Sequence, residues 1–290
     1  MATINANLND EIIAGSALEA FSAALAPVRA FSVSFDGEAS RKGDTINVPL
    51  VSTMSATNFS DYEGTGGELL NVSVSLNQHK VATAEITDVQ FANSSSADVE
   101  IFARAAGKAV AQAVIEYAFA LVTTVNFGAA TVTTYSGAFG TTQIRALRKA
   151  LSNSNAGPDR SLILNPDLYD DLFSDSTVVI ANPNFGSGGI REGNIGRVLG
   201  FDVYESTLTM ATSVRGFAVH PSAIAIAVRP LQAQAPSEYL ATRVETDSES
   251  GISLGYRRHY SAAKGKHYLN FEAVFGASAG VTSGLKMVRV

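Results

Sequence analysis

Residues 45–124 contain the feature that most constrains the fold of this chain: two alternating strands, a polar glycine-rich connection and one long helix. Apolar residues recur at every second position in residues 45–51 and 70–76, which is the period of a half-buried strand. The connection, residues 57–67, is too polar and too rich in glycine to pack a core of its own. Because a two-stranded arm is marginal in water by itself, we expect it to lie on a partner such as another copy of the chain.

The helix that follows is predicted over residues 97–124, about 28 residues or roughly 42 Å. Serines at positions 94–96 can cap it, and Asp98 and Glu100 lie in its first turn, where the helix dipole favours anions. Polar residues recur every four positions and form one narrow stripe of Arg104, Lys108, Gln112 and Glu116. Such evenly spaced polar groups argue against a membrane span. A stripe this thin predicts contact on most sides, by a sheet and by neighbouring subunits.

The composition of the 290-residue chain is 46% hydrophobic and only 17% charged, whereas soluble chains average about 25% charged. Extra surface buried against protein partners would explain this, and so would a rigid β-rich domain. The net charge of −6 argues against a dedicated nucleic-acid binder and leaves room only for weak contact. The chain has no cysteine, which excludes disulfides and thiolate metal sites and suits a cytoplasmic product. The first ten residues lack the basic start and apolar run of a secretory signal.

The remainder of the chain divides into three further regions. Near the N-terminus, Asn9 or Asp10 can cap a short helix that Pro27 ends, which we interpret as a docked arm rather than a core helix. The pattern of residues 131–230 changes to short alternating elements, which predicts a compact mixed α/β unit. Its expected helices are one capped by Thr141 or Thr142 and one after Asn165. Its expected strands are 161–164, 203–204, 216–219 and 224–228. The last third is predicted to form a sheet that covers the long helix, with strands at 239–245, 251–260, 267–275 and 285–290.

Catalytic motifs are not recognisable. The four histidines are scattered, without paired metal-ligand spacing: His79, His220, His259 and His267. No nucleophile elbow, Walker loop or dinucleotide fingerprint occurs, and we interpret residues 186–189 as a flexible loop rather than an anion cradle. Asp170, Asp171 and Asp175 are interpreted as solvated acids rather than cation ligands. We therefore predict no catalytic, cofactor-binding or metal-binding residue.

The tip of the two-stranded arm is different, because it combines aromatic and acidic side chains on an unsupported loop. This composition is typical of a contact surface. The tip residues are Phe59, Asp61, Tyr62 and Glu63.

Residues 192–206 read EGNIGRVLGFDVYES, a stretch in which Gly196 and Gly200 permit a tight turn while Phe201 and Val203 face a core. Together with residues 216–230 and the closing strands, with a glycine at position 276, the order of elements resembles that of tailed-bacteriophage major capsid proteins of the Hong Kong 97 fold. The similarity extends over nearly the whole chain.

The resemblance implies an α+β capsid fold with four parts: an N-terminal arm (1–35), an extended loop (36–88), a peripheral domain (89–130 and 235–290) with a spine helix over 97–124, and an axial domain (131–234). It implies a structural protein, not an enzyme, that self-assembles into the icosahedral head and encloses packaged double-stranded DNA. The expected subunit contacts are Phe59, Asp61, Tyr62, Glu63, Arg104, Lys108, Glu116 and Arg197.

The resemblance also implies partners: hexamers and pentamers of the same chain, a separate scaffolding protein, a portal, a decoration protein as a further candidate, and non-specific contact with the packaged DNA. No cofactor and no membrane are expected, and assembly would take place in the host cytoplasm. Some relatives cross-link a loop lysine to an asparagine, but no lysine lies between Thr53 and His79, so we expect a non-covalent shell. The alternatives are a soluble β-rich enzyme, such as a hydrolase without a recognisable motif, and a layer-forming surface protein.

Overall fold

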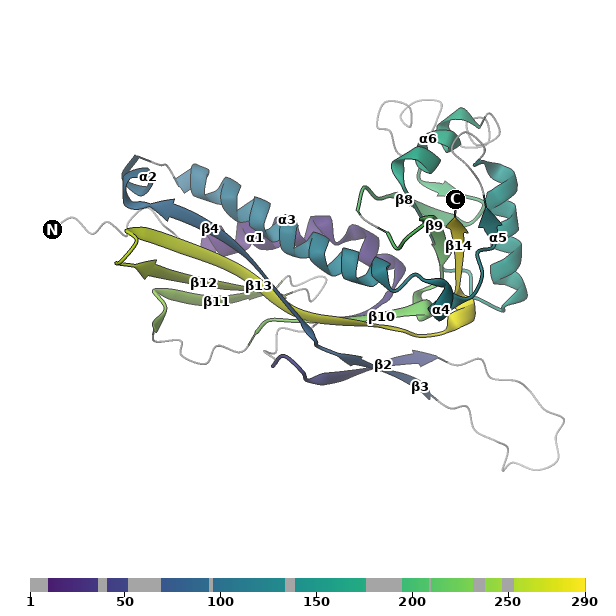
Figure 1. Cartoon of the computed structure of the whole chain (residues 1–290), viewed down its shortest axis with the longest axis horizontal. Helices are drawn as coiled ribbons and strands as arrows, with labels where there is room; N and C mark the ends of the chain where they lie inside the picture. The colour runs from purple at the N-terminus through teal and green to yellow at the C-terminus, as the bar shows by residue number, and fades with distance from the viewer. Residues whose placement is uncertain are drawn as a thin grey trace.

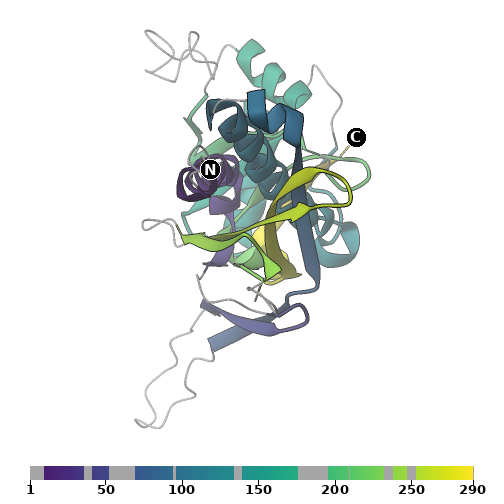
Figure 2. The same cartoon turned by 90° about the vertical axis from the view of Figure 1, so that its left-hand side faces the viewer.

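The computed structural model describes residues 10–35, 41–51, 69–93, 96–133, 139–175, 195–208, 210–231, 238–246 and 253–289. An elongated part, in which two helices lie along a sheet, adjoins a second part that holds its own sheet and helices (Figure 1). A separate hairpin lies on the other side of the first sheet (Figures 1 and 2).

The first sheet has six strands and is built around one long strand, β13 (Lys266–Ala279). The strand order is β1-β10-β13-β12-β11, and β4 also pairs with β13. Among the described pairs of this sheet, β1 and β10 are parallel and the others are antiparallel. The other strands are β1 (Ser32–Phe35), β4 (Gln78–Thr87), β10 (Ile224–Arg229), β11 (Ala241–Thr246) and β12 (Ser253–Ser261).

The two faces of this sheet bury different partners, as the strand period requires. In β13, Phe271, Ala273 and Phe275 belong to the core beneath the helices, whereas Val274 between them packs with the hairpin. β10 alternates in the same way, with Ile226 on the helix side and Ala227 on the hairpin side. Helices therefore cover one face of the sheet and the hairpin covers part of the other.

The long helix is α3 (Ser96–Ala120), which confirms the predicted helix but not its end. The helix ends at Ala120, four residues before the predicted end at position 124. After a turn, Thr123 caps the short helix α4 (Thr124–Phe127) by accepting a hydrogen bond from the Asn126 amide at 3.4 Å. The polar cap at Thr123 explains why the helix does not continue. No helix in the described part of the chain is long and apolar enough to cross a membrane.

The first helix, α1 (Asp10–Ala24), is a core helix, so the expectation that it lies outside the core is wrong. Its buried residues Ile13, Ala14, Ala17 and Phe21 belong to the same core as α3. Small residues at the crossing let the two backbones approach closely, because a Cβ added to Gly107 of α3 would overlap the carbonyl oxygen of Ala17. This close packing accounts for the many alanines of α1.

The second sheet also has six strands, in the order β5-β14-β9-β6-β8-β7. Two helices pack on it with an apolar core of their own, α5 (Thr141–Asn153) and α6 (Pro166–Ser174). Its strands are β5 (Val132–Thr133), β6 (Arg160–Leu164), β7 (Arg197–Val198), β8 (Phe201–Glu205), β9 (Val214–Val219) and β14 (Leu285–Arg289).

Two strands were predicted in the wrong sheet. The segment 224–228 was expected in the mixed unit, but β10 pairs with β1 and β13 in the first sheet. The last strand was expected to cover the long helix, but β14 pairs with β9 and β5 in the second sheet. The chain crosses between the sheets at both points, and local periodicity carries no information about such pairing.

An aromatic cluster joins the two sheets into one core. The ring centroids of Phe119 (α3) and Phe217 (β9) are 5.4 Å apart, and Phe31 lies 6.4 Å from Phe119 and 6.3 Å from Phe217. All three side chains are buried. Edge and offset contacts of this kind add to the burial energy, so the cluster fixes how the two parts meet.

Candidate functional site: surfaces for subunit contact

The hairpin consists of β2 (Thr45–Val51) and β3 (Leu69–Ser75), which pair antiparallel from Thr45↔Ser75 to Val51↔Leu69. This confirms the predicted strands. They form a two-stranded sheet of their own rather than joining either larger sheet. The hairpin rests on the first sheet through three buried side chains, Val48, Val74 and Leu76, which pack on Ala225, Ala227 and Val274.

The base of the hairpin is fixed by backbone contacts. The Leu76 amide donates to the Asp44 carbonyl and the Gly43 amide donates to the Leu76 carbonyl, both at 2.8 Å. The hairpin also crosses β13 closely, because a Cβ added to Gly276 would overlap the Ser75 carbonyl oxygen. The predicted tip residues Phe59, Asp61, Tyr62 and Glu63 lie outside the described residues.

The polar stripe of α3 lies on the surface, as predicted, but its residues do not converge on one point. Arg104 pairs with Glu19 of α1 at 3.5 Å across exposed side chains, while Lys108 and Glu116 are exposed further along the helix. The same helix exposes large apolar side chains at Ile101 (65% exposed) and Phe102 (56% exposed). Within one chain, α3 is therefore covered on one side only.

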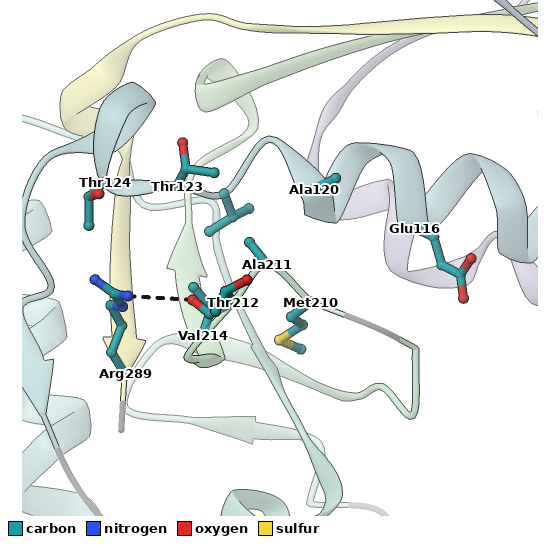
Figure 3. Close-up of a pocket in the computed structure, with 10 residues that line it drawn as sticks. Glu116, Ala120, Thr123, Thr124, Met210, Ala211, Thr212, Val214 and Arg289 are labelled. Atoms are coloured by element: carbon teal, nitrogen blue, oxygen red, sulfur yellow. Dashed lines mark hydrogen bonds between the residues drawn. The ribbon is translucent and has the colours of Figure 1, made fainter.

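A hollow of about 660 Å³ lies where α3 meets the second sheet (Figure 3). Glu116 stands at one end of it and Arg289 at the other, where the Arg289 Nη2 donates to the Thr212 carbonyl at 3.4 Å. Most of the remaining lining is alanine, valine and threonine. No nucleophile lies beside a base in this lining, so the hollow offers no catalytic arrangement.

The glycine-containing turn predicted from residues 192–206 forms at Leu199 and Gly200 between β7 and β8, while Gly196 directly precedes β7. Gly196 and Gly200 have φ values of 68° and 86°, in the region that favours glycine, and Phe201 and Val203 are buried as predicted. Arg197 is exposed, and its Nε lies 3.6 Å from the Asp202 carboxylate. It is far in the chain from the α3 stripe, and the structure places it in the other sheet.

The titratable residues singled out from the sequence have structural partners. His220 caps the short helix Pro221–Ala223 by accepting from the Ser222 amide. Asp175 was interpreted as a solvated acid, which is wrong, because its carboxylate accepts from the Thr141 amide and hydroxyl at 2.7 Å each. That carboxylate, rather than Thr141 or Thr142, caps α5. Among the described residues, no three His, Asp or Glu side chains gather as a metal site would require.

Two buried charge clusters were not found from the sequence. Glu272 in β13 contacts Arg257 of β12 at 2.6 Å and His79 of β4 at 2.9 Å. Asp10 at the start of α1 accepts from Tyr256 at 2.8 Å and pairs with Arg258 at 3.0 Å. Burial and the Asp10 carboxylate raise the pKa of Tyr256 well above its usual range, so this phenol stays protonated. The first cluster joins three strands of the first sheet, and the second ties α1 to β12.

Comparison with known proteins agrees with this architecture. The family model described as "Phage capsid protein" matches residues 72–275. No curated protein matches the sequence. Among solved structures, the fold is similar to a chain of Mycobacterium phage Che8 (TM-score 0.53, 16% identity, 86% of this chain and 88% of that one) and to the capsid of cyanophage P-SCSP1u (0.56, 14%, 90% and 86%). It is also similar to the virus-like particle from Pyrococcus furiosus (0.55, 10%, 96% and 98%).

The family match covers well over half of the chain, so the chain belongs to the phage capsid proteins. Its mixed helix and strand architecture is the Hong Kong 97-type α+β fold. The protein is thus a structural component of the virion, a major capsid protein whose copies associate to form the shell of the phage head.

Proposed function

We propose that copies of this chain tile through three surfaces: the hairpin with its tip, the exposed side of α3, and the part of the second sheet around Arg197. The observation that carries the proposal is that the hairpin forms a two-stranded sheet separate from the two larger sheets and rests on the first sheet through the small cluster of Val48, Val74 and Leu76. Such a hairpin gains stability from a further partner. In this arrangement Phe59, Asp61, Tyr62 and Glu63 contact a neighbour, and so do Arg104, Lys108, Glu116 and Arg197.

The proposed division of the subunit follows the Hong Kong 97 pattern. Residues 1–35 are the arm, 36–88 the extended loop, 89–130 and 235–290 the peripheral domain, and 131–234 the axial domain. The hairpin as a separate sheet and the second sheet with α5 and α6 support this division, from which β10 and β14 depart because each pairs in the sheet of the other domain. The axial part would surround the local symmetry axes of hexamers and pentamers.

The proposed shell is non-covalent and non-enzymatic, and it encloses double-stranded DNA through non-specific contact. The absence of lysine between Thr53 and His79 supports the non-covalent character of the shell. Denaturing electrophoresis of purified shells should give one band at the 30.3 kDa of the single chain. A ladder of heavier bands would contradict a non-covalent shell. Separate scaffolding, portal and decoration proteins, and assembly in the host cytoplasm, stay predictions from the resemblance.

Electron microscopy of the expressed protein tests the proposal directly. The wild type should form capsid-sized hollow particles or capsomer-like rings. Deletion of residues 59–66 should leave a folded subunit that forms no closed shell. A length-matched variant with Phe59, Asp61, Tyr62 and Glu63 replaced by serine separates the contact from loop length and should fail in the same way. Normal particles from both variants would refute the role of the tip, and a wild type that stays a small monomer would refute the shell function.

A further inference from the structure

The mixed unit built on β6 and β8 carries opposite charges at its two ends. These strands run parallel, with Arg160↔Phe201 at one end and Leu164↔Glu205 at the other. Their amino-terminal ends therefore lie together, and so do their carboxyl-terminal ends. The side chains that surround the first end are mainly basic, and those around the second are mainly acidic.

At the amino-terminal end, two adjoining hollows of about 510 and 420 Å³ form one groove, which we call the basic groove. They share Arg148, Ser152 and Leu199 as lining residues. Three cations of α5, Arg145, Arg148 and Lys149, are spaced i, i+3 and i+4. They lie on its outward face, because the inward face is occupied by Ile144, Leu147 and Leu151. The cations that line the groove are Arg145, Arg148, Lys149, Arg160 and Arg197.

Carboxylates neutralise little of this charge. Arg160 donates to backbone carbonyls, at 2.7 Å to Gly157 and 2.6 Å to Ala156, and its pKa is lowered by burial and by the nearby Arg148. Arg197 has Asp202 at 3.6 Å, and Asp159 is the other acid at this end. Among the described residues, no ion pair involves Arg145, Arg148 or Lys149. Three cations in the groove therefore have no counter-charge among the residues that the structure describes.

The carboxyl-terminal end presents the complementary set. Glu205 ends β8, and α6 begins directly after β6, so that Asp167 and Asp170 are exposed beside it. Asp171 and Asp175 face the start of α5, where they accept hydrogen bonds from the Phe139 and Thr141 amides. In the adjoining strand segments that the structure describes, Arg215 of β9 is the one cation. Three exposed carboxylates, Asp167, Asp170 and Glu205, match the three unpaired cations in number.

We propose that the basic groove of one subunit receives the acidic end of the same unit in a neighbouring copy. The inference rests on the proposed shell function and names the contact within it. A contact between two different surfaces of the same chain is head-to-tail, and repeated contacts of this kind close into a ring when the rotation between neighbours divides a full turn, as in a hexamer or pentamer. Opposite charges select this register, because two like ends repel when they meet. Nucleic acid is the weaker candidate for the groove, since the chain as a whole carries a charge of −6.

Charge reversal tests the pairing. One variant reverses the groove (Arg148→Glu with Lys149→Glu), and a second reverses the acidic end (Asp170→Lys with Glu205→Lys). Each should lower the yield of particles by roughly tenfold or more while the subunit stays folded. A four-site variant that combines both reversals again places opposite charges on the two surfaces, and it should recover most of the particle yield. The control, Arg243→Glu with Lys264→Glu, makes the same charge change at exposed positions outside the unit and outside the proposed contact surfaces, and should assemble normally.

Several outcomes would overturn the pairing: normal particles from either double variant, or a folded four-site variant that assembles no better than the doubles. Should a reversed variant fail to fold, the neutral pair Arg148→Gln with Lys149→Gln decides, and an undiminished particle yield from it overturns the proposal. Shells that form normally with the reversed groove but lose binding of a short DNA duplex would assign the groove to DNA instead. Absence of particles from the wild type would be a failure of the shell function, not of the pairing.

Discussion

Gly107 of α3 lies so close to the carbonyl oxygen of Ala17 in α1 that a Cβ atom at position 107 would overlap it. The atom that it meets is backbone, which cannot move without shifting the whole helix. The approach of α1 to α3 is thus set by the absence of a side chain at one position. Many buried residues of the first core lie at this helix pair, among them Phe21 and Val114.

Gly107→Ala should destabilise the subunit even though alanine is the better helix former. Overpacking costs about 1–3 kcal/mol, and the gain in helix propensity returns about 1 kcal/mol. We expect a net loss of about 1 kcal/mol in the free energy of unfolding, measured by urea denaturation of the unassembled subunit. Gly15→Ala in α1 is the control, because nothing lies within 4 Å of its added Cβ, and it should stabilise. Equal effects of the two substitutions would contradict the close-packing argument.

Gly276 sets how closely the hairpin approaches the first sheet. A Cβ at Gly276 would overlap the Ser75 carbonyl, so Gly276→Ala should push β3 away from β13. The result should be faster hydrogen exchange at the Leu76 and Gly43 amides, whose bonds close the base of the hairpin. Ser278→Ala, two residues along the same strand, is the matched control. Unchanged exchange at both amides in the glycine variant would show that the crossing at Gly276 does not hold the hairpin.

The alternating patterns at residues 45–51 and 70–76 were sufficient to predict the hairpin, because a period of two has one structural meaning when turn residues flank it. The turn at Gly196 and Gly200 was predicted for a similar reason, since few residues tolerate a positive φ. Strand order was harder. β10 is buried on both faces, and its sequence marks it as a buried strand without stating which sheet it joins.

The charged contacts depended still more on the tertiary fold. Asp10 and Arg258 are 248 residues apart in the chain, and nothing in the sequence near either one indicates the other. The cations of α5 were visible at helical spacing, but their opposition to Asp167, Asp170 and Glu205 follows only from the parallel pairing of β6 and β8. The sequence signals were local, whereas the charge polarity of the unit comes from topology.

Removal of the Glu272 carboxylate should be strongly destabilising. Its side chain is 5% exposed and contacts Arg257 at 2.6 Å and His79 at 2.9 Å. Glu272→Ala would leave the largely buried Arg257 without its counter-charge, at a cost of about 3 kcal/mol in the free energy of unfolding. Glu85→Ala is the control, because its ion pair with Lys266 is exposed and should contribute far less. A loss in the Glu272 variant no larger than in the control would contradict a structural role for the cluster.

Acidification should lower the stability of the subunit through His220. Burial lowers the pKa of His220 below its ordinary 6.5, with a smaller opposing effect of Asp159. The unfolded chain then binds a proton more readily than the folded one, so stability falls as the pH drops through about 6.5 toward the lower pKa of the folded state. His267, whose pKa burial also lowers, acts in the same direction.

The variant His220→Asn isolates this contribution, because asparagine can accept the same capping hydrogen bond from the Ser222 amide but does not titrate. Between about pH 7 and about pH 5, the free energy of unfolding of the variant should fall less steeply than that of the wild type. The double variant with His267→Asn should flatten the profile further, since both groups that take up protons on unfolding are then gone. Urea denaturation across this range measures the slopes. If the three slopes coincide, the buried imidazoles are not the source of the acid sensitivity.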